Sequence, residues 1–209
     1  MNNDDGNSND VFSRFTERWP QAGDRLFSVG RDSFLAHGAA ERNFRLLRGY
    51  KRAGDILIQT ALTERYDRDN LIFPALFNYR HYVELALKAI IEDHGAFAGV
   101  SIGSKNHKLP DLWKLFLEIA TAFSNDCSDT AAVAVGGCID EFARVDAKAT
   151  AFRYARDLNG GTPALPHDGI DLVSLHDAMN GIENFFECAD LDFSHKAEIA
   201  AEMAAEAAR

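Results

Sequence analysis

A chain of 209 residues, of which 46% are hydrophobic and 26% charged, is long enough for one globular domain with a sizeable core. No apolar run reaches the roughly 18 residues that a membrane span requires, so we expect no membrane-spanning segment. The formal net charge of −10 argues against broad electrostatic capture of nucleic acid, although a local basic patch can still bind RNA.

The N-terminal residues and the cysteines indicate the cellular compartment of the protein. Residues 1–10 are acidic and polar, unlike a secretory signal or a transit peptide, and we expect them to be disordered. The three cysteines, Cys127, Cys138 and Cys188, lack metal-finger spacing and are typical of small buried residues in a reducing compartment. The sequence therefore predicts a cytoplasmic protein with no metal and no other cofactor.

Residues 1–39 are expected to form a partly disordered N-terminal extension that wraps across a helical domain at 40–190. The first long helix of that domain is predicted at 40–66. Gly54 lies in its apolar face, where the missing side chain would permit a close helix crossing. A basic patch on this helix comprises Arg42, Arg45, Arg48, Lys51 and Arg52. Arg45, Arg48 and Arg52 share one face of the helix and form a positive ridge. We interpret this ridge as a solvated helix face, with an RNA-binding patch as the alternative.

The most informative segment is a predicted amphipathic helix over Phe73–Asp93. Its core-facing stripe at helical spacing consists of Leu76, Tyr79, Val83, Leu87 and Ile90. Arg80 and Glu84 lie one turn apart at the edge of this stripe, with His81 and Lys88 just outside it. An arginine or a carboxylate at such a boundary needs a partner.

Three further helices and a helical tail complete the predicted all-α bundle. A third helix begins near Pro110, whose missing N–H suits a first turn. A fourth begins near Asp129 or after Gly137 and ends around Asp157, and a fifth follows a loop rich in glycine and proline. The alanine- and glutamate-rich residues 191–209 form a helical tail that extends into solvent or covers a partner subunit.

Three segments, in this order, resemble the HEPN-domain family. Asn78–Asp93 is similar to the second HEPN helix, which carries an acidic residue and a following lysine. His107–Leu115 resembles the segment in which a histidine precedes a leucine-rich third helix. Phe152–Asp157 resembles the Arg-Tyr-Pro-Asp signature, with Ala155 in place of the proline. The resemblance covers residues 40–190 and implies a HEPN-like bundle of about five helices.

The resemblance also implies a biological setting. HEPN proteins are often dimeric, and many act in bacterial toxin–antitoxin or antiviral systems. We therefore expect RNA or a nucleotide as the ligand, a homodimer, and a partner protein encoded nearby. Catalytic members are metal-independent ribonucleases, in which an arginine and a polar residue precede a histidine by a short spacing. No histidine follows Arg153 or Arg156 at that spacing; the one literal match is Arg31 with His37, ahead of the bundle. Whether these two form a displaced HEPN motif stays open.

If the protein is a ribonuclease, we expect His81 to transfer the proton and Glu84 to orient its neighbours, with Arg80 and Arg153 as phosphate ligands. The other expected substrate-binding residues are Tyr154, Lys88 and His107.

The same charges also suit a structural network. Arg80 with Glu84, and Glu84 with Lys88, have the spacing of ion pairs on one helix, and Arg153 with Tyr154 would be their partners across the bundle. The alternative function is then a non-catalytic binding or assembly module for a partner protein or a nucleotide.

Overall fold

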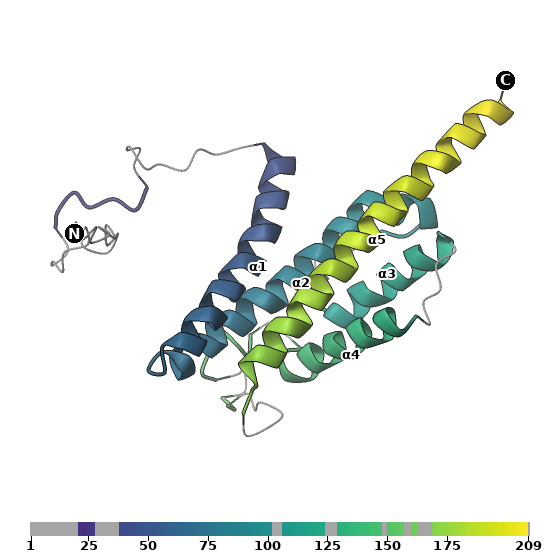
Figure 1. Ribbon diagram of the computed structural model, residues 1–209. Coiled ribbons are helices and arrows are strands. Elements are labelled where there is room, and N and C mark those ends of the chain that lie inside the picture. Colours follow the sequence, from purple (N-terminus) through teal and green to yellow (C-terminus); the bar gives the residue numbers. More distant parts are fainter. Residues whose placement is uncertain are drawn as a thin grey trace, which may run out of the picture. The chain divides into compact units, whose positions relative to one another are not determined.

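The computed structural model of this chain describes residues 21–27, 38–101, 106–123, 129–147, 150–156, 160–162 and 169–208, without the side chains at 39 and 40. The chain divides into two units, Met1–His37 and Gly38–Arg209. Within the described ranges it contains no strand and five helices: α1 (Ala39–Thr63), α2 (Arg68–Ala98), α3 (Leu109–Ala122), α4 (Thr130–Val145) and α5 (Leu172–Ala207) (Figure 1). The predicted all-α class is confirmed. The expectations for residues 1–10 and for a wrapping N-terminal extension fall on residues outside those described.

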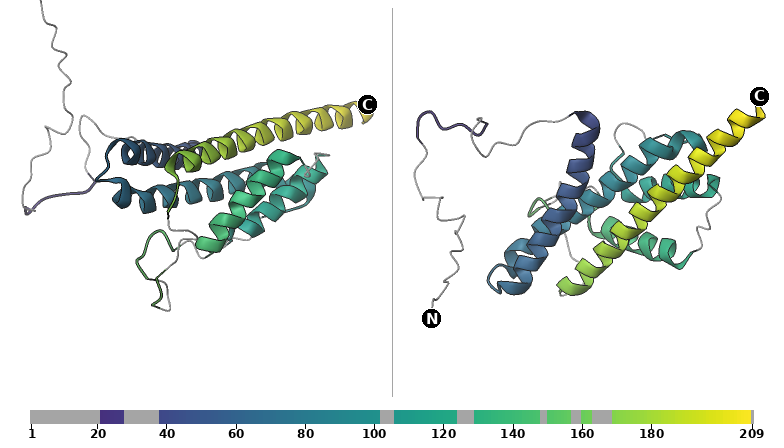
Figure 2. Two further views of the ribbon diagram at one scale, coloured as in Figure 1. Left: turned by 60° about the horizontal axis from the view of Figure 1, so that its bottom comes forward. Right: turned by 45° about the horizontal axis from the view of Figure 1, so that its top comes forward.

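The central helix is α2. It packs against α1, α3 and α5, while α4 contacts α3 and α5. The left view of Figure 2 shows α1 and α5 on one side of α2 and the α3–α4 pair on the other. Because neighbours cover α2 on several sides, it buries polar side chains as well as its apolar stripe, and those polar groups need internal partners.

The contact between α1 and α2 depends on a glycine, as the sequence predicts. A Cβ atom added to Gly54 would lie 2.4 Å from the ring of Tyr79, which is fully buried. No larger residue fits there without moving the ring. Gly54 therefore sets how closely α1 and α2 approach at the level of Tyr79.

The ends of α2 lie beyond the predicted Phe73–Asp93. The helix begins at Arg68, in spite of Pro74 within it, and ends at Ala98. Gly99 caps the C-terminus in the left-handed conformation, with φ of +71°, which few other residues adopt. The extra turns bring His94 into the core, where its Nε2 lies 2.7 Å from Oδ1 of Asp190 in α5.

The fourth helix is shorter than predicted. Asp129, one of its two predicted starts, is the N-cap and accepts a hydrogen bond from the N–H of Ala131. The helix ends at Val145 and not near Asp157. Phe152, within the predicted helix, is buried but belongs to the turn that follows α4.

The fifth helix runs without interruption into the predicted tail. It is capped by Asp171, which accepts a hydrogen bond from the N–H of Ser174, and continues to Ala207. The predicted boundary between a domain at 40–190 and a tail at 191–209 therefore does not interrupt the helix. Phe193 lies beyond that boundary and is fully buried, so core packing also crosses it.

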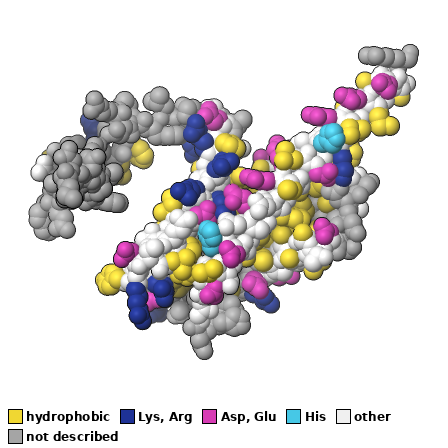
Figure 3. Space-filling model, viewed as in Figure 1, with side chains coloured by type: hydrophobic (Ala, Val, Ile, Leu, Met, Phe, Trp, Pro, Cys, Tyr) yellow, Lys and Arg dark blue, Asp and Glu magenta, His cyan; other side chains and the backbone are white. Residues whose placement is uncertain are grey.

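In the view of Figure 3, several basic side chains gather on α1 and several acidic side chains lie along α5. Exposed arginines of α1 are Arg42, Arg45, Arg48 and Arg52, and exposed acidic residues of α5 include Glu187, Glu198, Glu202 and Glu206. The predicted ridge of Arg45, Arg48 and Arg52 thus faces solvent, whereas Lys51, counted in the same basic patch, is buried. No helix in the described ranges has a segment long and apolar enough to cross a membrane.

Candidate functional site

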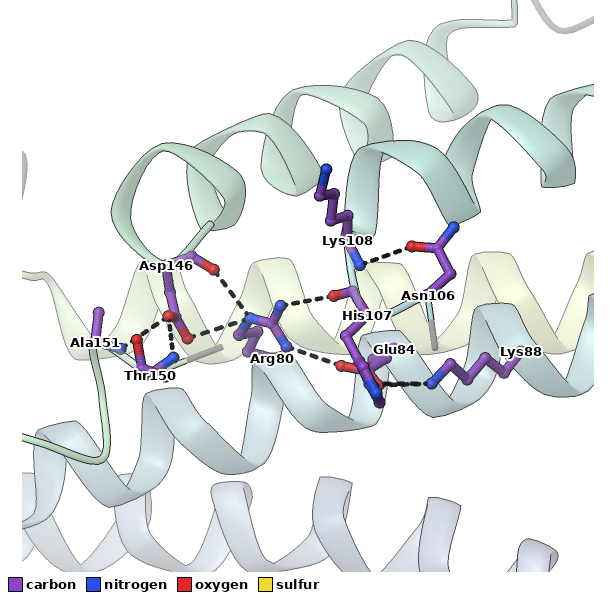
Figure 4. A network of polar contacts seen from close by, with 9 residues as sticks. All are labelled: Arg80, Glu84, Lys88, Asn106, His107, Lys108, Asp146, Thr150 and Ala151. Atoms are coloured by element: carbon purple, nitrogen blue, oxygen red, sulfur yellow. Dashed lines mark hydrogen bonds and ion pairs between the residues drawn. The ribbon is translucent and has the colours of Figure 1, made fainter. Parts of the chain in front are cut away.

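Arg80 of α2 is 3% exposed, and all three nitrogens of its guanidinium face acceptors (Figure 4). Nη1 donates to Oε2 of Glu84 at 3.0 Å, and Nη2 donates to the carbonyl oxygen of His107 at 3.0 Å. Nε donates to the carbonyl oxygen of Asp146 at 3.4 Å and lies 3.2 Å from Oδ2 of the same residue. The guanidinium therefore ties α2 to the segment before α3 and to the end of α4.

Glu84 lies one turn further along α2 and is equally buried. Its Oε1 accepts hydrogen bonds from Nζ of Lys88 at 2.8 Å and, with His107 protonated on Nδ1, from that nitrogen at 2.7 Å. Burial alone would raise the pKa of Glu84, but the hydrogen bonds from Lys88, His107 and Arg80 outweigh burial and lower it to about 2. Glu84 is therefore a permanent anion at neutral pH, as the predicted ion pairs with Arg80 and Lys88 require.

Asp146 is a member of this network that sequence reasoning missed. It follows the last residue of α4, and its side chain is 1% exposed. Oδ1 accepts hydrogen bonds from the backbone N–H groups of Thr150 at 2.5 Å and Ala151 at 2.8 Å, while Oδ2 faces Arg80. One carboxylate thus folds the turn after α4 and supplies negative charge to Arg80. The available signal was the tendency of aspartate to bond nearby backbone N–H groups and so to end a helix.

Arg153 and Tyr154 do not complete the buried network, so the expected partnership with Arg80 is wrong. Both side chains are exposed. The guanidinium carbon of Arg153 lies 5.7 Å from the ring centre of Phe77 in α2 and 5.5 Å from that of Tyr154. Arg153 therefore does reach α2, but it contacts an aromatic ring there.

His81 lies between two aromatic rings where α1 meets α2. Its ring centre is 4.4 Å from that of Tyr50, edge to face, and 5.8 Å from that of Phe77, with the planes parallel. Burial lowers the pKa of His81; Glu84 opposes this effect, and the positive charges of Arg80, Lys88 and Arg153 add to it. The imidazole is consequently neutral at pH 7 and able to accept a proton.

Six partly or fully exposed side chains lie along one face of α2, and we call them the α2 surface: Phe77, His81, Lys88, His107, Arg153 and Tyr154. Residues at positions 77, 81 and 88 share that face through helical spacing. Arg153 joins it at Phe77, and His107 joins it at Lys88, 3.3 Å from Nζ. Aromatic rings and cations together are the side chains that stack on bases and contact phosphates.

A second buried polar cluster joins α1 to α5. Lys51 is 2% exposed, and its Nζ contacts Asp55 at 2.9 Å, Asn180 at 2.8 Å and Glu183 at 3.0 Å. The hydroxyl of Tyr79 donates to Oδ1 of Asp55 at 3.0 Å. Sequence reasoning counted Lys51 in the basic patch and missed this cluster. The signal that could have indicated an internal ion pair is the one-turn spacing of Lys51 and Asp55.

Comparisons with protein-family models, with curated proteins and with solved structures found no match. Within the described ranges, no three histidine, cysteine, aspartate or glutamate side chains converge on a point that would hold a metal ion. Arg31 and His37, the literal match to the HEPN motif, lie outside the described residues.

Proposed function

We propose that this chain is a HEPN-like helical bundle that recognises RNA or a nucleotide through the α2 surface. The observation that carries this proposal is the stacking of neutral His81 on Phe77, beside the exposed guanidinium of Arg153. A base stacks on the partly exposed rings of Phe77 and His81, and a phosphate pairs with Arg153 and Lys88. The order of the three HEPN-like segments supports the same ligand class.

The structure favours different roles for residues that sequence reasoning grouped together. Arg80 and Glu84 are buried and bonded to one another, so they position the surface and do not touch the ligand. Phosphate binding falls to Arg153 and Lys88. If the RNA is cleaved, His81 is the proton-transfer group, because it is neutral and half-buried beside a cation.

Binding is tested by fluorescence anisotropy with a single-stranded RNA. Arg153→Ala should weaken binding about fivefold and lower the slope of log K against log salt by about 1, because one phosphate contact is lost. Arg144→Ala is the matched control, since Arg144 is an exposed arginine on α4 that is not part of the α2 surface. Equal loss in both variants, or no loss in Arg153→Ala, contradicts the proposal.

Catalysis is tested by RNA cleavage in the presence of a metal chelator. A metal-independent ribonuclease loses turnover in His81→Ala even at RNA concentrations that saturate the variant. Turnover by His81→Ala at the wild-type rate removes His81 from the mechanism.

The second candidate function is a non-catalytic module for a nucleotide or a partner protein. The occupation of every Arg80 nitrogen by internal acceptors favours it, because Arg80 is the one buried arginine among the described residues and is not free to hold a developing charge. It predicts nucleotide or RNA binding without turnover under any condition of the cleavage assay.

The wider setting rests on the family resemblance. We propose a cytoplasmic homodimer that acts with a partner protein encoded nearby, in a toxin–antitoxin or antiviral system. Light scattering on the purified chain tests the dimer, since a mass near 23.1 kDa would identify a monomer.

A further inference from the structure

A cavity of about 400 Å³ lies between α2, α4 and the first turns of α5. Its volume falls within the range of roughly 300–1,000 Å³ that small-molecule sites occupy. Figure 1 shows the C-terminal end of α4 beside the N-terminal end of α5, and residues of both ends line the cavity. Its apolar wall consists mainly of Leu76, Phe142, Phe152, Leu175, Met179 and Ile182.

The polar groups of the cavity carry one sign of charge. Glu141 from α4 and Asp171 from the start of α5 contribute carboxylates, and Ser174 and Cys138 contribute a hydroxyl and a thiol. No lysine, arginine or histidine lines the cavity among the described residues. Arg144 approaches Glu141 only to 3.9 Å, between two side chains that are both 72% exposed, so this pair is weak.

Both carboxylates are exposed to solvent at the edge of the cavity. Oδ1 of Asp171 accepts the capping hydrogen bond from the N–H of Ser174, and hydrogen bonds from Ser174 and from the N–H of Val173 lower the pKa of Asp171. Glu141 has no acceptor role in the core, because its side chain is largely exposed.

We propose that this cavity binds a small amphiphile with an apolar body and a cationic amine head. The apolar body fills the space between Phe142, Phe152 and Met179, and the ammonium group pairs with Glu141 and Asp171 at the rim. The site is separate from the α2 surface, so the inference does not rest on RNA recognition, and its assays can fail while the RNA assays succeed.

The charge of the head group is tested with three eight-carbon probes on the full chain: octylamine, octanoate and octanol. Titration calorimetry at pH 7 should find octylamine bound about tenfold more tightly than octanoate, because the rim carboxylates attract an ammonium group and repel a carboxylate. The affinity of octanol should lie between those of octylamine and octanoate. No binding of octylamine, or octanoate binding as tightly, overturns the proposal.

The rim carboxylates are tested with neutral substitutions of the same shape. Glu141→Gln combined with Asp171→Asn should remove the preference for octylamine over octanol, and asparagine keeps the helix cap. Glu187→Gln is the matched control, because Glu187 is an exposed glutamate of α5 that does not line the cavity. A preference that survives the double substitution shows that the carboxylates do not bind the amine.

Occupation of the cavity is tested at Cys138. Burial raises the pKa of its thiol, with a smaller contribution from Glu141, so alkylation is slow and easily followed. In a Cys127→Ser, Cys188→Ser background, octylamine should slow the alkylation of Cys138 by iodoacetamide several-fold. Unchanged alkylation at saturating octylamine places the amine elsewhere.

A substitution that fills the cavity with a larger side chain gives an independent test of the proposed site. Ala178 of α5 lines the cavity, and Ala178→Phe should abolish octylamine binding while the helical circular dichroism is retained. Wild-type affinity in this variant overturns the proposed site.

Discussion

Arg80 acts as a three-way connector within the fold. Its guanidinium is planar and rigid, and its nitrogens reach Glu84 on its own helix, the His107 carbonyl and Asp146. Burying these charges gains little net stability, but removing one partner leaves the others uncompensated in the interior. The residue is therefore expected to be costly to replace even if it never touches a ligand.

We expect Arg80→Met to lower the free energy of unfolding by about 3–5 kcal/mol, because the carboxylates of Glu84 and Asp146 lose their shared cation. Arg80→Lys should restore only part of this loss, since an ammonium cannot point donors at three fixed acceptors. Urea unfolding measures both variants. Lys114→Met is the control, as Lys114 is an exposed lysine 4.0 Å from Glu118. A loss no larger than the control's would show that the network does not connect these segments.

Acid should weaken the same network in a defined pH range. The folded-state pKa of Glu84 is about 2, below the ordinary value of 4.5, so its contribution to stability is complete above pH 4.5 and is lost as pH falls toward 2. The shift corresponds to roughly 3 kcal/mol. Unfolding free energies between pH 6 and pH 2 should fall less steeply for Glu84→Gln, which starts lower, than for the wild type. Parallel curves would contradict the assignment.

For single residues, sequence reasoning predicted ion pairs within one helix and missed polar contacts between helices. The pairs of Arg80 with Glu84 and of Glu84 with Lys88 follow from one-turn spacing, and both are present. The contacts of Asp146 with Arg80 and of Lys51 with Glu183 were missed because the partners lie far apart along the chain, and helical spacing carries no information about distant segments.

At the scale of the elements, close contact between α1 and α2 requires that one position have no side chain. Gly54 faces the buried ring of Tyr79, whereas a Cβ atom added to Gly49 in the same helix would have no neighbouring atom within 4 Å. Alanine substitutions at the two positions therefore distinguish the intrinsic helix preference of alanine, which acts at both, from steric overlap, which acts only at Gly54.

We expect Gly49→Ala to stabilise the protein by up to about 1 kcal/mol, because alanine favours the helix over glycine. Gly54→Ala should destabilise it by about 1–3 kcal/mol in spite of the same preference, because the new methyl group overlaps the Tyr79 ring. Thermal unfolding compares the two variants. Stabilisation of both would mean that α1 and α2 are not in contact at Gly54.

Helix ends were predicted less well than helix faces. The apolar faces of α1, α2 and α5 follow from periodicity, and the predicted Gly54 crossing is present. The end of α4 was misplaced because periodic apolar residues continue to Phe152, although Asp146 bonds the following backbone and ends the helix at Val145. A buried turn that places an apolar side chain in register cannot be told from another helical turn by pattern alone.

At the scale of the whole molecule, α1 and α5 share few contacts, and Lys51 supplies a buried link between them. Its ammonium contacts Asn180 and Glu183 of α5 and Asp55 of its own helix. The carboxylates are partly exposed, at 14% for Asp55 and 29% for Glu183, so water compensates part of any loss.

Removing this link should loosen one side of the bundle without unfolding it. We expect Lys51→Met to lower the unfolding free energy by roughly 2 kcal/mol, because two carboxylates and an amide lose a charged donor. Arg52→Met, the exposed neighbour on the same helix, is the control and should change stability little. Hydrogen exchange should then be faster in the first turns of α5, around Asn180, than in α3, which does not contact Lys51. Equal acceleration in α3 and α5 would show that Lys51 supports the bundle as a whole and not the contact between α1 and α5.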